Sequence, residues 1–221
     1  MKRLSAVFLM ADDSGKKACE IAKKAGIDFD VVILNNLNAL DHAFSKPHDL
    51  LLSFGTGVIV PPRILSMQGT LALNVHAASP DYPGRDPHHF AIYDGVKKYG
   101  ATIHHMMQSV DAGPIIDIEL FDVPRDTTPF RLLELANDAG WRLLERFFAG
   151  YKNHGALPKI ENIRWGELKF TRKMFLEMCR VDLNMSQEEI TKRFKATSMP
   201  GHHNLYIDFN GYRFRIEDQK E

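Results

Sequence analysis

An amide and an imidazole stand two residues apart, as Asn74 and His76, where a short apolar run ends. Side chains alternate along a β-strand, so both groups would point to the same side. A carboxylate, Asp111, follows in a turn-rich segment and could be folded back beside His76. These three groups suit transfer of an acyl-like group, because an amide stabilises a developing oxyanion while an oriented imidazole moves a proton. On these residues alone, a structural histidine and a simple turn-forming aspartate are open interpretations too.

Short apolar runs predict the strands that would position these groups. They fall at residues 4–9, 30–34, 50–52 and 71–75, with helix-like sequence among them. This alternation is typical of an α/β fold, in which helices pack on a mostly parallel sheet. Ligands of such sheets bind where loops leave the carboxyl ends of the strands. We therefore expect the site along the loops at 53–57 and 76–87.

Further elements follow the second of these loops. Residues 101–107 and 115–121 are strand-like, and the turn that carries Asp111 separates them. Thr128-Pro129 then predicts the start of a helix, with threonine as its cap, and Gly150 predicts its end.

The composition shifts near residue 157. A capping box at 186–189 predicts a short helix, and Asn210-Gly211 predicts a β-hairpin. We therefore expect a Rossmann-like core over residues 1–156 and a small C-terminal α+β subdomain over residues 157–221. The aromatic side chains of the hairpin could form a homodimer surface or pack against their own domain, and both interpretations stay open.

The charge balance argues against nucleic acid as the partner. The 221 residues include 28 Lys or Arg and 28 Asp or Glu, whereas nucleic-acid-binding proteins usually carry a basic excess. We expect a small-molecule partner instead. We also expect no metal, because the histidine spacings match no zinc motif.

Cysteine usage and hydropathy indicate the compartment. Cys19 and Cys179 form no C-x-x-C pair, which predicts reduced thiols. No stretch approaches the roughly 20 apolar residues that a membrane span needs. The short apolar run near the N-terminus is followed directly by Asp12-Asp13, whereas a signal peptide has a longer apolar region and a cleavage site. These features predict a cytoplasmic protein that is not bound to a membrane.

Two ordered motifs carry a family resemblance. The first runs from Asn74-x-His76 through Pro80 to Tyr82-Pro83-Gly84, and the second from Gly100-x-Thr102-x-His104 to Asp111-x-Gly113-x-Ile115-Ile116. Both resemble signatures of the folate-dependent formyltransferases. The resemblance implies a formyltransferase core, N10-formyltetrahydrofolate as cosubstrate, and catalytic roles for Asn74, His76 and Asp111.

The resemblance also implies binding residues. For folate they are Phe54, Gly55, Thr56, Gly57, Val110 and Asp111. For the acceptor they are Tyr82, Gly84, Arg85 and His105. Because side chains alternate along a strand, at most one of His104 and His105 can face the site.

Among the branches of this family, the sugar N-formyltransferases fit best. They formylate an amino group on a nucleotide-linked deoxysugar, and the His104-His105-Met106 run resembles their second signature. A UDP-linked sugar is the favoured acceptor. The chain resembles the smaller members of this branch, including those of pseudaminic-acid-type pathways. The sequence leaves open the nucleotide and the ring position of the amine.

Four alternatives remain. Glycinamide ribonucleotide formyltransferases usually have P-S-L-L-P after the signature histidine, where this chain has Ala77-Ala78-Ser79-Pro80. Methionyl-tRNA formyltransferases need a basic surface, but residues 157–221 carry 12 Lys or Arg and 10 Asp or Glu. A formyl-folate hydrolase and a non-catalytic folate or nucleotide-sugar binding protein are the other two.

Overall fold

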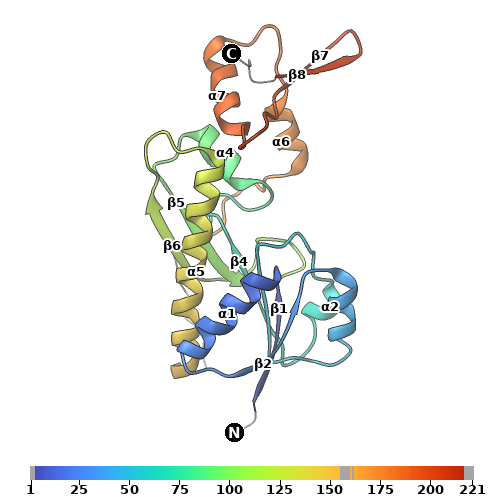
Figure 1. Ribbon diagram of the computed structural model, residues 1–221, viewed down its shortest axis with the longest axis vertical. Helices are drawn as coiled ribbons and strands as arrows, with labels where there is room; N and C mark the ends of the chain where they lie inside the picture. Colours follow the sequence, from blue (N-terminus) through green and yellow to red (C-terminus); the bar gives the residue numbers. More distant parts are fainter. Residues whose placement is uncertain (1–2, 155–159, 161, 217–221) are drawn as a thin grey trace.

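A six-stranded sheet forms the centre of the computed structural model, which describes residues 3–154, 160 and 162–216 (Figure 1). Its strands are β1 (Leu4–Leu9), β2 (Phe29–Leu34), β3 (Leu50–Phe54), β4 (Leu71–His76), β5 (Lys98–His105) and β6 (Ile115–Asp122). They are ordered β2-β1-β3-β4-β5-β6. β5 is antiparallel to both of its neighbours, and the other strands all run in one direction. The predicted α/β fold with a mostly parallel sheet is confirmed.

Helices cover both faces of this sheet, giving three layers. α1 (Asp12–Lys24) and the long α5 (Pro129–His154) pack on one face, whereas α2 (Leu37–Ala43) and α3 (Pro62–Leu65) pack on the other. Alternation along β1 explains this: Phe8 faces α1 and α5, and its neighbours Val7 and Leu9 face α2 and α3. Strands with apolar side chains on both faces are therefore buried on both.

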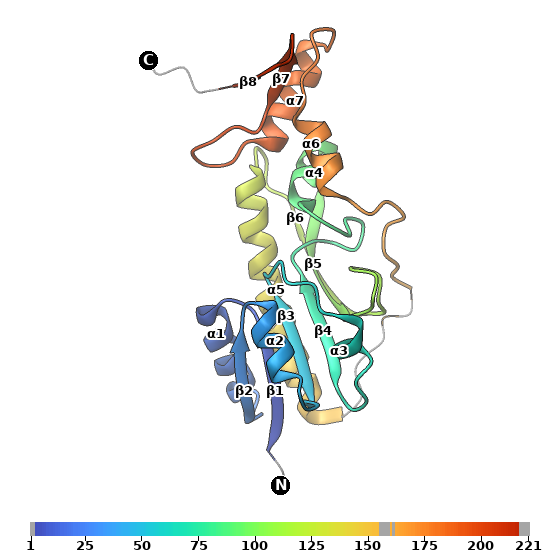
Figure 2. The ribbon, with the colours of Figure 1, turned by 90° about the vertical axis from the view of Figure 1, so that its right-hand side faces the viewer.

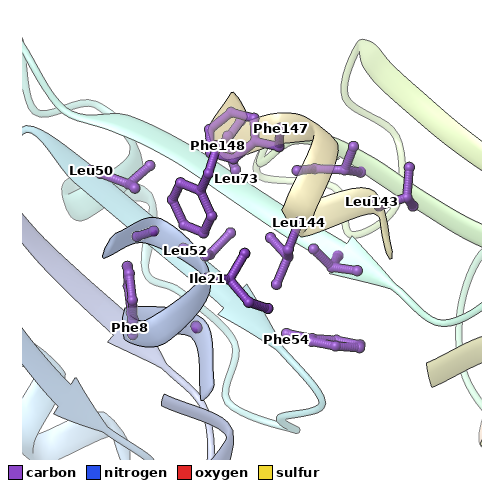
Figure 3. Close-up of a cluster of buried hydrophobic side chains, with 14 of the residues drawn as sticks. Phe8, Ile21, Leu50, Leu52, Phe54, Leu73, Leu143, Leu144, Phe147 and Phe148 are labelled. Carbon is purple, nitrogen blue, oxygen red and sulfur yellow. The ribbon is translucent and has the colours of Figure 1, made fainter. Parts of the chain in front are cut away.

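The largest apolar cluster fixes α5 against the sheet. Leu143, Leu144, Phe147 and Phe148 of α5 meet strand residues such as Leu52 (Figure 3). This packing holds a rigid platform beneath the loops that follow β3 and β4.

The start of α5 agrees with the sequence, but its end does not. The Thr128 hydroxyl accepts a hydrogen bond from the Arg131 backbone N–H, as a cap should. The helix continues past Gly150 to His154, so the predicted end was wrong. Tyr151 supplies the reason, because its ring packs on Phe29 and Phe147 and keeps the last turns on the sheet.

The remaining elements lie at the opposite end of the molecule from α1 and α2 (Figure 1). They are α4 (Pro87–Asp94), α6 (Arg172–Cys179), α7 (Gln187–Thr197), β7 (Tyr206–Phe209) and β8 (Tyr212–Arg215). The Ser186 side chain caps α7 through the Glu189 N–H, and Asn210 and Gly211 both have positive φ, so the predicted cap and hairpin are confirmed.

One apolar cluster joins these C-terminal elements to the core. It places Phe175 and Met178 of α6 against Phe90 of α4 and Leu132 of α5. The predicted boundary between residues 156 and 157 lies outside the described residues. Among the residues that are described, no helix combines the length and apolar character needed to cross a membrane.

Candidate active site

A pocket of about 500 Å³ opens at the carboxyl end of β4, beside β5. Asn74 and His76 both line it, since the two-residue spacing turns them to one side of β4. Asp111 lines it too, from the turn between β5 and β6. The structure thus brings together the three groups that the sequence singled out, although Asp111 is distant from the other two along the chain.

Asp111 lies between two imidazoles. Its Oδ2 is 3.6 Å from His76 Nδ1, and its Oδ1 is 3.4 Å from His104 Nε2. The Gly84 backbone N–H donates a hydrogen bond of 2.9 Å to Oδ2. Asp111 has a φ of +47°, an uncommon conformation for a residue with a side chain, and such strain is typical of functional sites.

The surroundings keep this buried carboxylate charged. Burial, the largest single effect, by itself raises the pKa of Asp111. The hydrogen bond to His104, the nearby His76 ring and the Gly84 N–H act in the other direction. Together they outweigh burial, so the pKa of Asp111 lies below its usual value.

His104 is a site residue that the sequence did not select. It is almost fully buried, and its Nε2 lies 3.1 Å from the Asn74 side-chain nitrogen. Of the described residues, His104 lines the pocket whereas His105, the expected acceptor contact, does not. Alternation along the strand had left that choice open, and the pairing of β5 with β4 places His104 opposite Asn74.

His76 is held from both sides of its ring. Its Nε2 lies 2.9 Å from the backbone carbonyl oxygen of Tyr82, and its Nδ1 faces Asp111. The Tyr82 side chain points elsewhere: its hydroxyl donates to Asp94 and its ring stacks on Phe170. Tyr82 therefore contributes its carbonyl oxygen to the site, while the expected contact between its ring and the acceptor has no support in its position.

The loop after β3 is divided between pocket and core. Thr56 and Gly57 line the pocket as expected. Phe54 is buried in the core with its ring edge-on to Trp141, and Gly55 is likewise not among the described residues that line the pocket.

Apolar side chains that the sequence did not single out form much of the pocket wall. They are Val58, Ile59, Val60, Leu65, Met106 and Met107, and the expected Val110 joins them. Such a wall, with a few polar groups at one end, is typical of a site for a small organic molecule.

A segment that precedes α6 closes the other side of the site. Residues 162–170, which we call the strap, run past the loop that follows β5 (Figure 2). Lys169 and Phe170 of the strap line the pocket, together with Gly84 and Arg85, which were expected there. The lysine Nζ donates to the Val110 carbonyl oxygen. Nothing in the sequence of the strap signalled this role.

Among the described residues, no group of three or more His, Cys, Asp or Glu side chains could hold a metal ion. The polar side chains that line the pocket include an amide, two imidazoles and a buried carboxylate.

Comparisons with known proteins identify relatives of this chain. The family model described as "Formyl transferase" matches residues 6–146. A methionyl-tRNA formyltransferase of Natranaerobius thermophilus is 40% identical over 180 residues, which are 79% of this chain and 55% of that protein. The chain spans about half the length of the curated relatives it matches.

Solved structures share the fold at lower identity. A 4-N formyltransferase from Francisella tularensis is 17% identical, with a TM-score of 0.79 over 99% of this chain and 98% of that one. HypX from Aquifex aeolicus, in complex with tetrahydrofolic acid, is 17% identical, with a TM-score of 0.66 over 96% of this chain and 37% of that one.

Proposed function

Because this chain belongs to the formyl transferase family, we propose that it transfers a formyl group from N10-formyltetrahydrofolate to the amino group of a nucleotide-linked amino-deoxysugar. One observation carries the proposal: Asn74, His76 and His104 converge with Asp111 at one pocket. The apolar wall beside them fits the flat, partly apolar pterin of a folate.

Asn74 stabilises negative charge in this reaction. As the amine attacks the formyl carbon, the formyl oxygen gains charge and needs a hydrogen-bond donor. The side-chain amide of Asn74 has two N–H groups, and one of them faces His104. The other is available to the pocket, which Asn74 lines.

His76 and Asp111 manage the proton. The attacking amine must lose its proton to react, and an imidazole at the site can accept one. The Asp111 carboxylate then faces a positively charged ring at 3.6 Å, a favourable interaction in a buried position. Asp111 therefore both orients His76 and stabilises it once the proton has moved.

The choice of a sugar acceptor rests on two features. A solved sugar N-formyltransferase from a Shewanella species shares the fold over nearly all of both chains, at 16% identity and with a TM-score of 0.78. The formal charge of zero gives this chain no basic excess with which to bind tRNA. Arg85 and Lys169 at the pocket supply local positive charge that suits the phosphates of a UDP-linked sugar, the favoured acceptor.

A release assay tests the proposal. Tetrahydrofolate release is followed while UDP-, dTDP- and GDP-linked amino-deoxysugars are offered one at a time with N10-formyltetrahydrofolate. We expect release with one sugar and transfer of the formyl group to it. Release without any acceptor would indicate a hydrolase. Folate binding without release would overturn the sugar assignment in favour of glycinamide ribonucleotide, tRNA or a binding role.

A further inference from the structure

Trp165 of the strap contacts both imidazoles of the site. Its ring centroid lies 4.9 Å from that of His104 and 6.0 Å from that of His76, with interplanar angles of 87° and 61°. The indole N–H donates a hydrogen bond of 2.7 Å to the Gly113 carbonyl oxygen, two residues beyond Asp111. One side chain thus touches both rings that flank Asp111 and also the turn that carries Asp111.

Backbone hydrogen bonds fix the strap on each side of Trp165. The Gly166 N–H donates to the Pro80 carbonyl oxygen. The Phe170 N–H donates to the Pro83 carbonyl oxygen, and the Phe170 carbonyl oxygen accepts from the Arg85 N–H. These contacts join the strap to the loop that follows His76. Since the indole is anchored at Gly113 as well, the strap ties the loop that follows β4 to the turn that carries Asp111.

Glycines make this close approach feasible. A Cβ atom at Gly166 would lie 2.6 Å from the Asp81 carbonyl oxygen, and one at Gly113 would lie 1.9 Å from the His105 carbonyl oxygen. Both distances are shorter than non-bonded atoms allow. The chain therefore has glycine at the two positions where the strap and the Asp111 turn need close backbone packing.

We propose that Trp165 is a positioning residue for formyl transfer. It holds the imidazoles of His76 and His104 in their orientations beside Asp111 and keeps water from that side of the rings. The inference rests on the proposed function, and it adds a residue from outside the matched region 6–146 to the catalytic arrangement.

Kinetics of two variants test this role against simple core filling. Trp165→Ala removes the ring, and we expect kcat to fall by about 100-fold, as a displacement near 1 Å can cause, with little change in KM. Trp165→Phe keeps an aromatic ring against the imidazoles and should recover much of the lost kcat. Trp141→Phe, on the sheet-facing side of α5 beside Phe54, is the matched control and should retain wild-type kcat.

An unchanged kcat in Trp165→Ala, or a change confined to KM, would exclude a positioning role. If Trp165→Ala does not fold, the pH profile of kcat is compared between Trp165→Phe and Trp141→Phe. A profile shifted only in Trp165→Phe supports the positioning role, because filling of the core does not alter the pH dependence. Identical profiles would overturn it.

Fluorescence tests the contact without turnover. The chain has two tryptophans, so Trp141→Phe leaves Trp165 as the sole emitter. The His104 ring lies edge-on to this indole, so we expect the emission of Trp165 to change when His104→Gln is added. Emission unaffected by His104→Gln would overturn the inference. A changed emission together with no formyl transfer to any acceptor would instead place the failure in the proposed function.

Discussion

Asn74 on β4 and His104 on β5 lie directly opposite each other, and the Asn74 side-chain nitrogen is 3.1 Å from His104 Nε2. His104 Nδ1 lies 2.9 Å from the His105 carbonyl oxygen, an acceptor, so in the neutral ring the proton belongs on Nδ1. Nε2 faces both the Asn74 amide nitrogen and, 3.4 Å away, Asp111 Oδ1. The neutral ring accepts a hydrogen bond from Asn74, whereas a ring protonated on Nε2 donates one to Asp111. This pairing holds the Asn74 amide at the pocket that it lines.

Removing the oxyanion donor or the base should abolish most turnover. We expect Asn74→Ala to lower kcat by about 100- to 1,000-fold, as for the loss of one oxyanion donor. His76→Ala should cost about 100- to 10,000-fold, the usual contribution of a general acid–base group. Steady-state kinetics with the accepted sugar would measure both, and circular dichroism would verify folding. Turnover close to wild type in either variant would contradict the mechanism.

His104 and its neighbour provide a matched pair. His104→Ala takes the acceptor away from Asn74 and a partner away from Asp111, so we expect kcat to fall by up to about 100-fold through misplacement of these groups. His105→Ala, one residue along the same strand, should have a much smaller effect because the described pocket lining does not include His105. Equal losses would show that the strand, and not the imidazole of His104, is what matters.

Asp111 links activity to acid stability. Asp111→Asn should lower kcat by at least about 100-fold, since it removes the charge that faces His76. The folded-state pKa of Asp111 is depressed, so its stabilising effect is fully present above the unfolded value of about 3.9 and is lost as the pH falls through the folded value. Urea unfolding should therefore show a wild-type advantage over the variant that is constant at neutral pH and shrinks below about pH 4. An advantage that grows in acid would contradict this sign.

Gly84 tests how the strap is docked. It has a φ of +106°, and a Cβ there would lie 2.2 Å from the Phe170 carbonyl oxygen. Gly69 has a φ of +84° with open space around its Cβ position, so Gly69→Ala should cost only the conformational strain, about 1–2 kcal/mol. We expect Gly84→Ala to cost clearly more free energy of unfolding and to lower kcat as well. Equal costs in urea titrations would mean that the contact with the strap is dispensable.

His88 predicts acid sensitivity where α4 meets the C-terminal elements. Burial, followed by the charge of His89, lowers the pKa of His88 to about 3. The unfolded chain takes up this proton near pH 6.5. The free energy of unfolding therefore has its full value above that pH and falls between about pH 6.5 and pH 3, by up to about 1.4 kcal/mol per pH unit. His88→Gln should flatten this slope, whereas His42→Gln, at an exposed position on α2, should leave it unchanged. Parallel slopes for His88→Gln and wild type would refute the assignment.

The local parts of the fold could be predicted from the sequence because their patterns are local. Apolar runs marked the strands at 4–9 and 71–75, and Asn210-Gly211 marked its turn. The two-residue spacing of Asn74 and His76 placed both on one side of a strand, because side chains alternate along any strand. The end of α5 was missed because Tyr151 extends the helix through contacts with a distant strand.

The tertiary structure alone decided which groups meet. Periodicity assigns His104 and His105 to opposite faces, but only the register of β5 against β4 determines which of them lies opposite Asn74. The irregularity of the β5–β6 pairing at Ile103 and His104 lies beside that position. Trp165 reaches the site through packing of a segment far along the chain. Local sequence encodes the face of each element, whereas contacts between distant elements depend on how those elements pack.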